Sequence, residues 1–244
     1  MGEKRHPYSP LVESKSPDYF DHERQEVLNA IRQAGITEAS HVLELGCSSG
    51  RFGSRLSRIL KADRYVGLDY SEDAILTATQ HLDRALVCDL NTASPSDLGL
   101  PDEEFDLLVA LDVLEHLYDP WQALTRFAAC LKPGGFAVVS VPNIQNIAIL
   151  NGLAHGQWHY QREGILDATH IRFFTRATAV QLLAGAGFDI VQLGAILNPN
   201  PAELQITDKD NHLNLGRFSL HGLSRDESMA FFVFQYIMVG QRKR

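Results

Sequence analysis

The sequence predicts an α/β fold built on a doubly wound, mostly parallel sheet of seven strands. Short apolar runs alternate along the chain with stretches of helical periodicity. The run 105–111 is nearly all apolar, as expected of a parallel strand that helices cover on both faces. A length of 244 residues suits one large domain, so we expect 1–244 to form a single unit.

The expected elements follow one another in the order of such a fold. Residues 1–34 form an N-terminal arm and a helix over 18–34, which Gly35 is placed to end. Strands are expected at 41–45, 65–69, 85–89, 105–111, 136–141, 188–197 and 231–239. Helices are expected at 51–60, 71–82, 120–130 and 175–186, with Ser71 as an N-cap.

Two stretches are longer than ordinary connections between strands and helices. Residues 143–174 follow the fifth strand, and residues 198–230 separate the last two strands. Insertions of this length usually shape a binding site. Both should rise from the sheet edge where open α/β folds bind ligands, so we expect them to shape an acceptor site.

Composition argues against a nucleic-acid-binding, disulfide-rich or membrane-spanning protein. A net charge of −8 argues against a nucleic-acid partner, because neutralising phosphates requires an excess of Lys and Arg. The three cysteines are widely spaced, which fits buried thiols in a reducing compartment rather than a disulfide framework. The first residues do not resemble a signal peptide, and the longest apolar stretch, 230–240, is too short to span a bilayer. We therefore expect a cytoplasmic protein, and the sequence leaves its oligomeric state undecided.

The stretch from Glu44 to Gly50 is the strongest functional signal. A strand, a glycine-rich turn and a helix in succession place backbone N–H groups beside a ligand. Gly46 permits a sharp turn, and Gly50 permits close approach of the ligand. Phosphate is disfavoured, because Glu44 would repel it and the Walker pattern is absent. The simpler alternative is a purely structural turn.

Two further acids favour a ligand. Asp69 ends the second expected strand, where a carboxylate can accept both hydroxyls of a ribose. Asp89 ends the third, where it can accept an adenine amino group. With Glu44, three acids at successive strand ends predict a cationic nucleoside such as S-adenosylmethionine.

These segments resemble the motifs of class I S-adenosylmethionine-dependent methyltransferases. The similar segments are 42–50, 66–71, 87–90, 105–117 and 131–135. The resemblance implies a Rossmann-like sheet with an antiparallel final strand. One departure is Ser48, which stands where the usual loop has its middle glycine.

The resemblance also implies residue roles in binding the donor S-adenosylmethionine. The methionine part of the donor should be lined by Glu44, Gly46, Cys47 and Gly50. The ribose and adenine should be bound by Asp69, Tyr70, Asp89 and Leu90. Leu111 should face the sulfonium, and Tyr19 should cover the donor.

The segment 164–175 narrows the resemblance to small-molecule methyltransferases. That subgroup includes ubiquinone-biosynthesis O-methyltransferases and enzymes encoded with glycosyltransferases. It implies a small-molecule acceptor, which we expect to be methylated on a hydroxyl. Acceptor contacts are expected from Trp158, His159, Asp167, Arg172 and Phe173, although an aromatic cluster within a lid, or a turn cap at Asp167, would explain some of them equally well.

Removing a proton from a hydroxyl near neutral pH suits histidine. His116 lies just beyond the fourth expected strand, and His170 lies in the first insertion, so both are candidate catalytic residues. Each has a structural alternative, packing a turn or holding a loop. Two acids and a histidine spaced like Asp112, Glu115 and His116 hold a divalent metal in some quinone O-methyltransferases. Because acids at a helix start are also favoured by the helix dipole, we expect no metal here.

Two other functions remain open at this stage. An NAD-dependent oxidoreductase would use a similar sheet, but its G-x-G-x-x-G pattern is interrupted at Ser48. A non-catalytic module that binds the donor would share every donor motif, and the long insertions could then bind protein.

Overall fold

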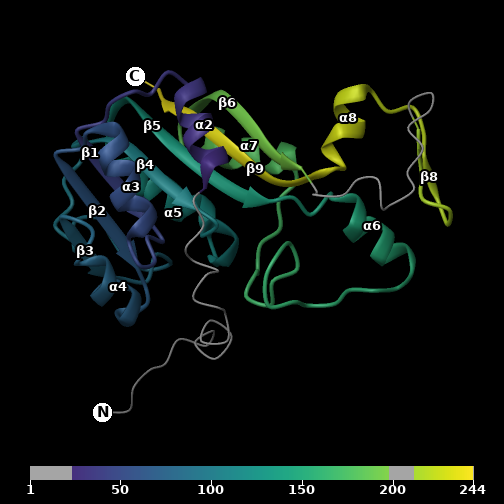
Figure 1. The fold of residues 1–244 in the computed structure, drawn as a ribbon, viewed down its shortest axis with the longest axis horizontal. Coiled ribbons are helices and arrows are strands. Elements are labelled where there is room, and N and C mark those ends of the chain that lie inside the picture. Colours follow the sequence, from purple (N-terminus) through teal and green to yellow (C-terminus); the bar gives the residue numbers. More distant parts are fainter. Residues whose placement is uncertain (1–23, 198–211, 244) are drawn as a thin grey trace, which may run out of the picture.

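The computed structural model describes residues 24–197 and 212–243 (Figure 1). Its main sheet has seven strands in the order β3-β2-β1-β4-β5-β9-β6. Their bounds are β1 His41–Leu45, β2 Arg64–Asp69, β3 Arg84–Val87, β4 Phe105–Leu111, β5 Leu131–Pro142, β6 Phe188–Leu197 and β9 Val233–Arg242. Strands β1 to β5 pair in parallel, and β9 runs antiparallel between β5 and β6. The predicted seven-stranded sheet with an antiparallel final strand is confirmed.

Helices cover both faces of this sheet. Their bounds are α2 Gln25–Gln33, α3 Arg51–Leu60, α4 Glu72–Ala78, α5 Pro120–Ala128 and α7 Arg176–Gly185. One core cluster joins the sheet to α2, α3 and α4, and the other joins it to α5 and α7. Strand β4 serves both: Leu108 and Ala110 face one cluster while Leu107 and Val109 face the other, all fully buried. This two-sided burial explains the unbroken apolar run that predicted the strand.

Several boundaries differ from those expected, for local reasons. Helix α4 begins after Ser71, whose Oγ accepts from Ala74 N at 3.3 Å, but it ends at Ala78 instead of 82. Strand β3 stops at Val87, so Asp89 lies beyond the strand. Strand β5 starts early because Leu131 already pairs with Phe105, before a register shift.

The strands before the two insertions, β5 and β6, both pair antiparallel with β9 and so end at the same edge of the sheet. The first holds α6, Ile147–Ala154, followed by irregular backbone. The described part of the second holds the hairpin β7 Leu213–Asn214 and β8 Ser219–Leu220, then α8 Arg225–Ala230. Figure 1 shows α6, α8 and β8 grouped beyond the tip of β5.

A small separate core, with Ile147, Leu213 and Phe231 at its centre, joins the two insertions. The side chain of Asn143 adds hydrogen bonds to the carbonyls of Ala230 and Val233, each 2.9 Å. The described parts of the two insertions therefore pack together into one cap. Within the described residues, every helix is too short or too polar to cross a membrane.

Candidate active site

The glycine-rich loop is held against β2. The N–H groups of Gly46 and Cys47 donate to the carbonyl of Leu68 at 2.7 and 3.0 Å. A Cβ at Gly67 would lie 2.6 Å from the Cys47 sulfur, so glycine is required for this close approach. The loop then turns into α3 at Gly50, whose φ of +75° favours glycine. The edge thus carries a tightly packed turn followed by a helix N-terminus.

Ser48 adopts the conformation that a glycine would take more easily. Its φ is +48°, in the left-handed region, which costs a non-glycine residue roughly 1 kcal/mol. The strain is offset by the Ser48 N–H, which donates to Asp69 Oδ2 at 2.9 Å. Asp69 Oδ1 accepts from the N–H of Ser71 at 3.0 Å. Asp69 therefore fixes the loop beside the end of β2.

Glu44 lies on the α2–α4 face of β1, inside the core. Its Oε2 accepts from the hydroxyl of Tyr65 at 2.9 Å, and a Cβ on Gly53 would come within 2.7 Å of it. Burial raises the pKa of Glu44 to about 8, although the Tyr65 bond opposes this. The carboxyl therefore keeps its proton to a higher pH than an exposed glutamate does, and it lies between Tyr65 of β2 and Gly53 of α3. The expected role of Glu44 beside the methionine part of the donor stays a prediction.

The adenine-side residues lie at the ends of β2 and β3. Tyr70 is 38% exposed at the end of β2, while Leu90 is buried. Asp89 Oδ1 accepts from the backbone and side-chain nitrogens of Asn91 at 2.9 and 2.8 Å. Tyr19 lies outside the described residues.

The residue after β4, Asp112, has a strained backbone and forms an ion pair with Arg24 that the sequence did not predict. Asp112 has a φ of +54°, and its carboxylate accepts from Arg24 Nη1 at 2.9 Å and from Ser140 Oγ at 2.7 Å. The amide of Gln235 also donates to it. Arg24, just before α2, thereby brings a guanidinium to the ligand-binding edge. No local pattern marks Arg24, because its partner lies 88 residues away.

His116 and His170 come together although 54 positions separate them in sequence. Their ring centroids are 4.7 Å apart with an interplanar angle of 68°. His116 Nδ1 lies 3.2 Å from the carbonyl of Thr169, and His170 Nδ1 lies 3.0 Å from that of Ile165. A carbonyl only accepts, so each Nδ1 carries hydrogen and each neutral ring has its lone pair on Nε2.

Glu115 lies beside the histidines and was not predicted as a single functional residue. It is fully buried, and His170 Nε2 is 3.9 Å from its Oε1. Burial, and then the charge of Asp112, raises the pKa of Glu115 well above its ordinary value. The carbonyl of Glu115 accepts the N–H groups of Ile171 and Arg172 at 3.0 Å each. The first insertion is therefore attached directly to the turn after β4.

The expected acceptor residues separate into two groups. Trp158 packs edge-on against Phe173 at 5.7 Å and against Tyr160 at 6.5 Å, and His159 beside it is exposed. These side chains form an aromatic surface that an acceptor could contact.

The other two expected acceptor residues support the loop. Asp167 is buried, and its Oδ1 accepts from the N–H and the hydroxyl of Thr169 at 2.9 and 2.6 Å. Arg172 Nε donates to the carbonyl of Tyr118 at 3.0 Å. These positions favour the turn-cap alternative for Asp167 and an anchoring role for Arg172 over contact with the acceptor.

The chain matches a known family over most of its length. The family described as "Methyltransferase domain" matches residues 19–193. The chain belongs to this methyltransferase family. It is an S-adenosylmethionine-dependent methyltransferase of class I. The family match therefore favours this function over an NAD-dependent oxidoreductase and over a non-catalytic module.

Individual relatives agree with the family match. The methyltransferase is 29% identical over 177 residues to a ubiquinone biosynthesis O-methyltransferase of Cereibacter sphaeroides, covering 71% of this chain and 70% of that one. It is 32% identical to a "Probable S-adenosylmethionine-dependent methyltransferase" of Mycolicibacterium smegmatis, over 67% of this chain and 58% of the relative. Its fold is similar to that of a solved SAM-dependent methyltransferase from Archaeoglobus fulgidus, with a TM-score of 0.61, 18% identity, and coverage of 96% of this chain and 100% of the other.

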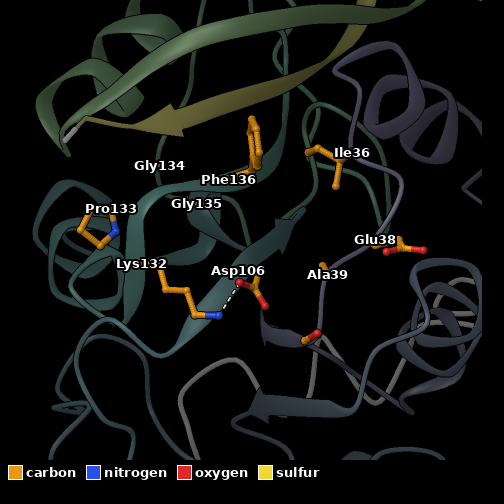
Figure 2. A pocket seen from close by; sticks show the side chains of 10 residues that line it. Ile36, Glu38, Ala39, Asp106, Lys132, Pro133, Gly134, Gly135 and Phe136 are labelled. Atoms are coloured by element: carbon orange, nitrogen blue, oxygen red, sulfur yellow. Dashed lines mark hydrogen bonds and ion pairs between the residues drawn. The ribbon is translucent and has the colours of Figure 1, made fainter.

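A cavity of about 380 Å³ lies at the opposite edge of the methyltransferase sheet (Figure 2). Its lining includes Ser40 before β1, Asp106 near the start of β4, and the stretch 132–136 of β5. Lys132 Nζ lies 2.5 Å from Asp106 Oδ1, the ion pair drawn in Figure 2. Because this cavity is at the amino ends of the parallel strands, it is not where the methyltransferase would bind its donor.

Proposed function

We propose that the methyltransferase transfers a methyl group from S-adenosylmethionine to a hydroxyl of a small molecule. The observation that carries the proposal is the pair of histidines just beyond Leu111. His116 and His170 lie 4.7 Å apart, with both Nδ1 atoms on carbonyls, so that Nε2 is the basic atom of each neutral ring. The aromatic surface of Trp158 and Phe173, which the same insertion as His170 supplies, suits an acceptor with a flat apolar part.

The donor would lie across the carboxyl ends of β1, β2 and β4. Asp69 would accept the ribose hydroxyls beside the N–H groups that it accepts from Ser48 and Ser71, since a carboxylate oxygen can accept more than one hydrogen bond. Both hydrogen bonds from Asn91 to Asp89 use Oδ1, and Oδ2 would accept the adenine amino group. Tyr70 would cover the adenine ring.

The amino-acid part of the donor is a zwitterion, and the same edge has groups for it. Arg24 would bind the donor carboxylate, because a guanidinium is planar and forms paired hydrogen bonds with carboxylates. Leu111, at the end of β4, would face the sulfonium. The loop from Gly46 to Gly50 would support the methionine chain through its backbone.

The transfer itself is a displacement at carbon. The acceptor oxygen attacks the methyl carbon, the carbon–sulfur bond breaks, and its electron pair leaves with sulfur as S-adenosylhomocysteine. The hydroxyl proton would pass to an imidazole Nε2. His116 is half-buried and the better placed to meet an acceptor, while His170 is almost fully buried and would orient it. Holding the two reactants in line can supply much of the rate.

Turnover assays with acceptors of different chemistry test this proposal. The panel should contain catechols and other phenols, sugar hydroxyls, amines and carboxylic acids, with production of S-adenosylhomocysteine as the readout. We expect methylation of a hydroxyl. Loss of turnover by about 10²- to 10⁴-fold in His116→Gln is expected, with affinity for S-adenosylhomocysteine retained.

His155→Gln is the matched control, because His155 is exposed at the end of α6 and its Nδ1 also contacts a carbonyl, that of Asn151, at 2.8 Å. It should keep wild-type turnover. Methylation of amines alone, or full activity in both His116→Gln and His170→Gln, would refute the proposal.

A further inference from the structure

Glu115, His116 and His170 form a compact cluster of metal-ligating side chains. One potential ligand atom from each lies within 4.8 Å of the other two. An ion with bonds of about 2.1 Å holds tetrahedral ligands about 3.4 Å apart. The 3.9 Å between His170 Nε2 and Glu115 Oε1 exceeds that spacing by only a few tenths of an ångström. We propose that these three residues bind a single divalent transition-metal ion, of the class of Zn²⁺, Co²⁺ or Fe²⁺.

The two imidazoles are oriented as metal ligands usually are. A ligating histidine commonly donates its other ring N–H to a carbonyl or carboxylate, which fixes the tautomer and the ring orientation. The Nδ1 atoms of His116 and His170 have such carbonyl partners, Thr169 and Ile165, at 3.2 and 3.0 Å. Both carbonyls belong to the first insertion, so the insertion orients both rings.

Glu115 supplies the second, independent observation. Its side chain is fully buried, and across the described residues neither carboxylate oxygen has a hydrogen-bond partner. Burying a carboxyl group without a hydrogen-bond partner is energetically unfavourable, and coordination of a cation would offset that free-energy cost. The carboxyl lies beside the Nε2 atom of His170, where it would share an ion with the rings.

The ligand set differs from the one that the sequence suggested. Asp112 is not part of the cluster, because its carboxylate is already held by Arg24, Ser140 and Gln235. A second imidazole, from His170, takes the third position. Two nitrogens and one oxygen favour transition metals, whereas Mg²⁺ and Ca²⁺ prefer oxygen ligands. The expectation that no metal is used is therefore replaced by this proposal.

Three protein ligands leave coordination positions for an acceptor oxygen, and this part of the inference rests on the proposed function. When bound, such an ion lowers the pKa of a coordinated hydroxyl. In the metal-bound enzyme, His116 and His170 would hold the ion, and the proton of the coordinated hydroxyl would pass to water. In the metal-free enzyme, the proton would pass to His116 Nε2, as proposed above.

Metal binding can be measured without turnover. Untagged full-length protein is stripped with a chelator and titrated with Zn²⁺, Co²⁺ or Mg²⁺, following melting temperature, bound metal by elemental analysis, and the visible absorption of Co²⁺. We expect one Zn²⁺ or Co²⁺ per chain, a cobalt spectrum typical of nitrogen ligation, and a rise in melting temperature that an equal concentration of Mg²⁺ does not produce. Glu115→Gln and His170→Ala should weaken Co²⁺ binding at least 10-fold.

Glu38→Gln and His155→Ala, which change an exposed glutamate and an exposed histidine, are the matched controls and should retain wild-type Co²⁺ affinity. Binding of S-adenosylhomocysteine by each variant reports whether the fold and the donor site persist, so a failed metal site is distinguishable from a failed methyltransferase. Absence of stoichiometric Zn²⁺ or Co²⁺ binding, tighter binding of Mg²⁺, or equal weakening in the controls would overturn the proposal.

Discussion

Replacing Glu44 with glutamine should change how the stability of the protein depends on pH. Burial raises the pKa of Glu44 from its ordinary 4.5 to about 8. Between these two pH values the folded protein keeps a proton that the unfolded chain releases. The folded state then binds more protons, so raising the pH favours unfolding. The stabilising contribution of the neutral carboxyl is complete below pH 4.5 and is lost as the pH rises to about 8.

The size of the effect follows from the same pKa. Each pKa unit is worth about 1.4 kcal/mol, so the full loss is about 5 kcal/mol, of which about 3 kcal/mol falls between pH 6 and pH 9. Glutamine cannot ionise, and its amide oxygen can still accept from the Tyr65 hydroxyl. Relative to wild type, Glu44→Gln should therefore gain about 3 kcal/mol in free energy of unfolding from pH 6 to pH 9, or roughly 1 M in urea midpoint.

Urea denaturation at pH 6, 7, 8 and 9, followed by circular dichroism, measures this gain. The control is Glu38→Gln, because Glu38 is an exposed acid whose pKa is lowered by its hydrogen bond to Lys61. Glu38 is ionised throughout the range in both states, so this variant should run parallel to wild type. Parallel curves for Glu44→Gln and wild type would refute the burial argument.

Three further substitutions test the donor edge. Ser48→Gly should raise the free energy of unfolding by about 0.5–1 kcal/mol, because glycine relieves the left-handed strain at φ +48°; a drop in urea midpoint would contradict this. Gly50→Ala should reduce both stability and donor binding, since its Cβ would lie 3.1 Å from the Ala78 Cα at a φ of +75°; calorimetric titration with S-adenosylhomocysteine at wild-type strength would count against a role in the site. Arg24→Gln should weaken donor binding at least 10-fold by the same titration, as a lost charged hydrogen bond is worth roughly 1.5–3 kcal/mol, and an unchanged affinity would exclude Arg24 from the carboxylate site.

The sequence predicted best the strands that are buried on both faces of the sheet. Strands β1 and β4 begin and end where expected, because their apolar runs are bounded by polar residues and buried on both faces. The end of α4 was missed, since the residues after Ala78 continue a helical pattern while forming turns. The end of α4 depends on where the chain turns towards β3, which the local pattern does not indicate.

The candidate site was predicted residue by residue but not as an arrangement. His116 and His170 were each named, yet their contact depends on how the first insertion returns to the turn after β4. Glu115 was considered together with Asp112, and spacing alone did not show that one carboxylate is buried without a hydrogen-bond partner while the other is paired with Arg24. The burial of Glu44 was missed for a related reason: the alternation along β1 places it on an interior face, where it accepts from the Tyr65 hydroxyl.

The hydrogen bonds from two asparagine side chains of the first insertion to the chain around the start of β9 have a consequence for mutation. Asn143 and Asn146 both donate to the carbonyl of Val233, and Asn143 also donates to that of Ala230. A backbone carbonyl is present whatever side chain its residue carries. These hydrogen bonds therefore do not depend on the residue types at the two accepting positions. Side chains of the cap can be exchanged by mutation while its anchorage is inherited unchanged. Substitutions at Ala230 or Val233 that keep the backbone path should therefore leave these hydrogen bonds in place.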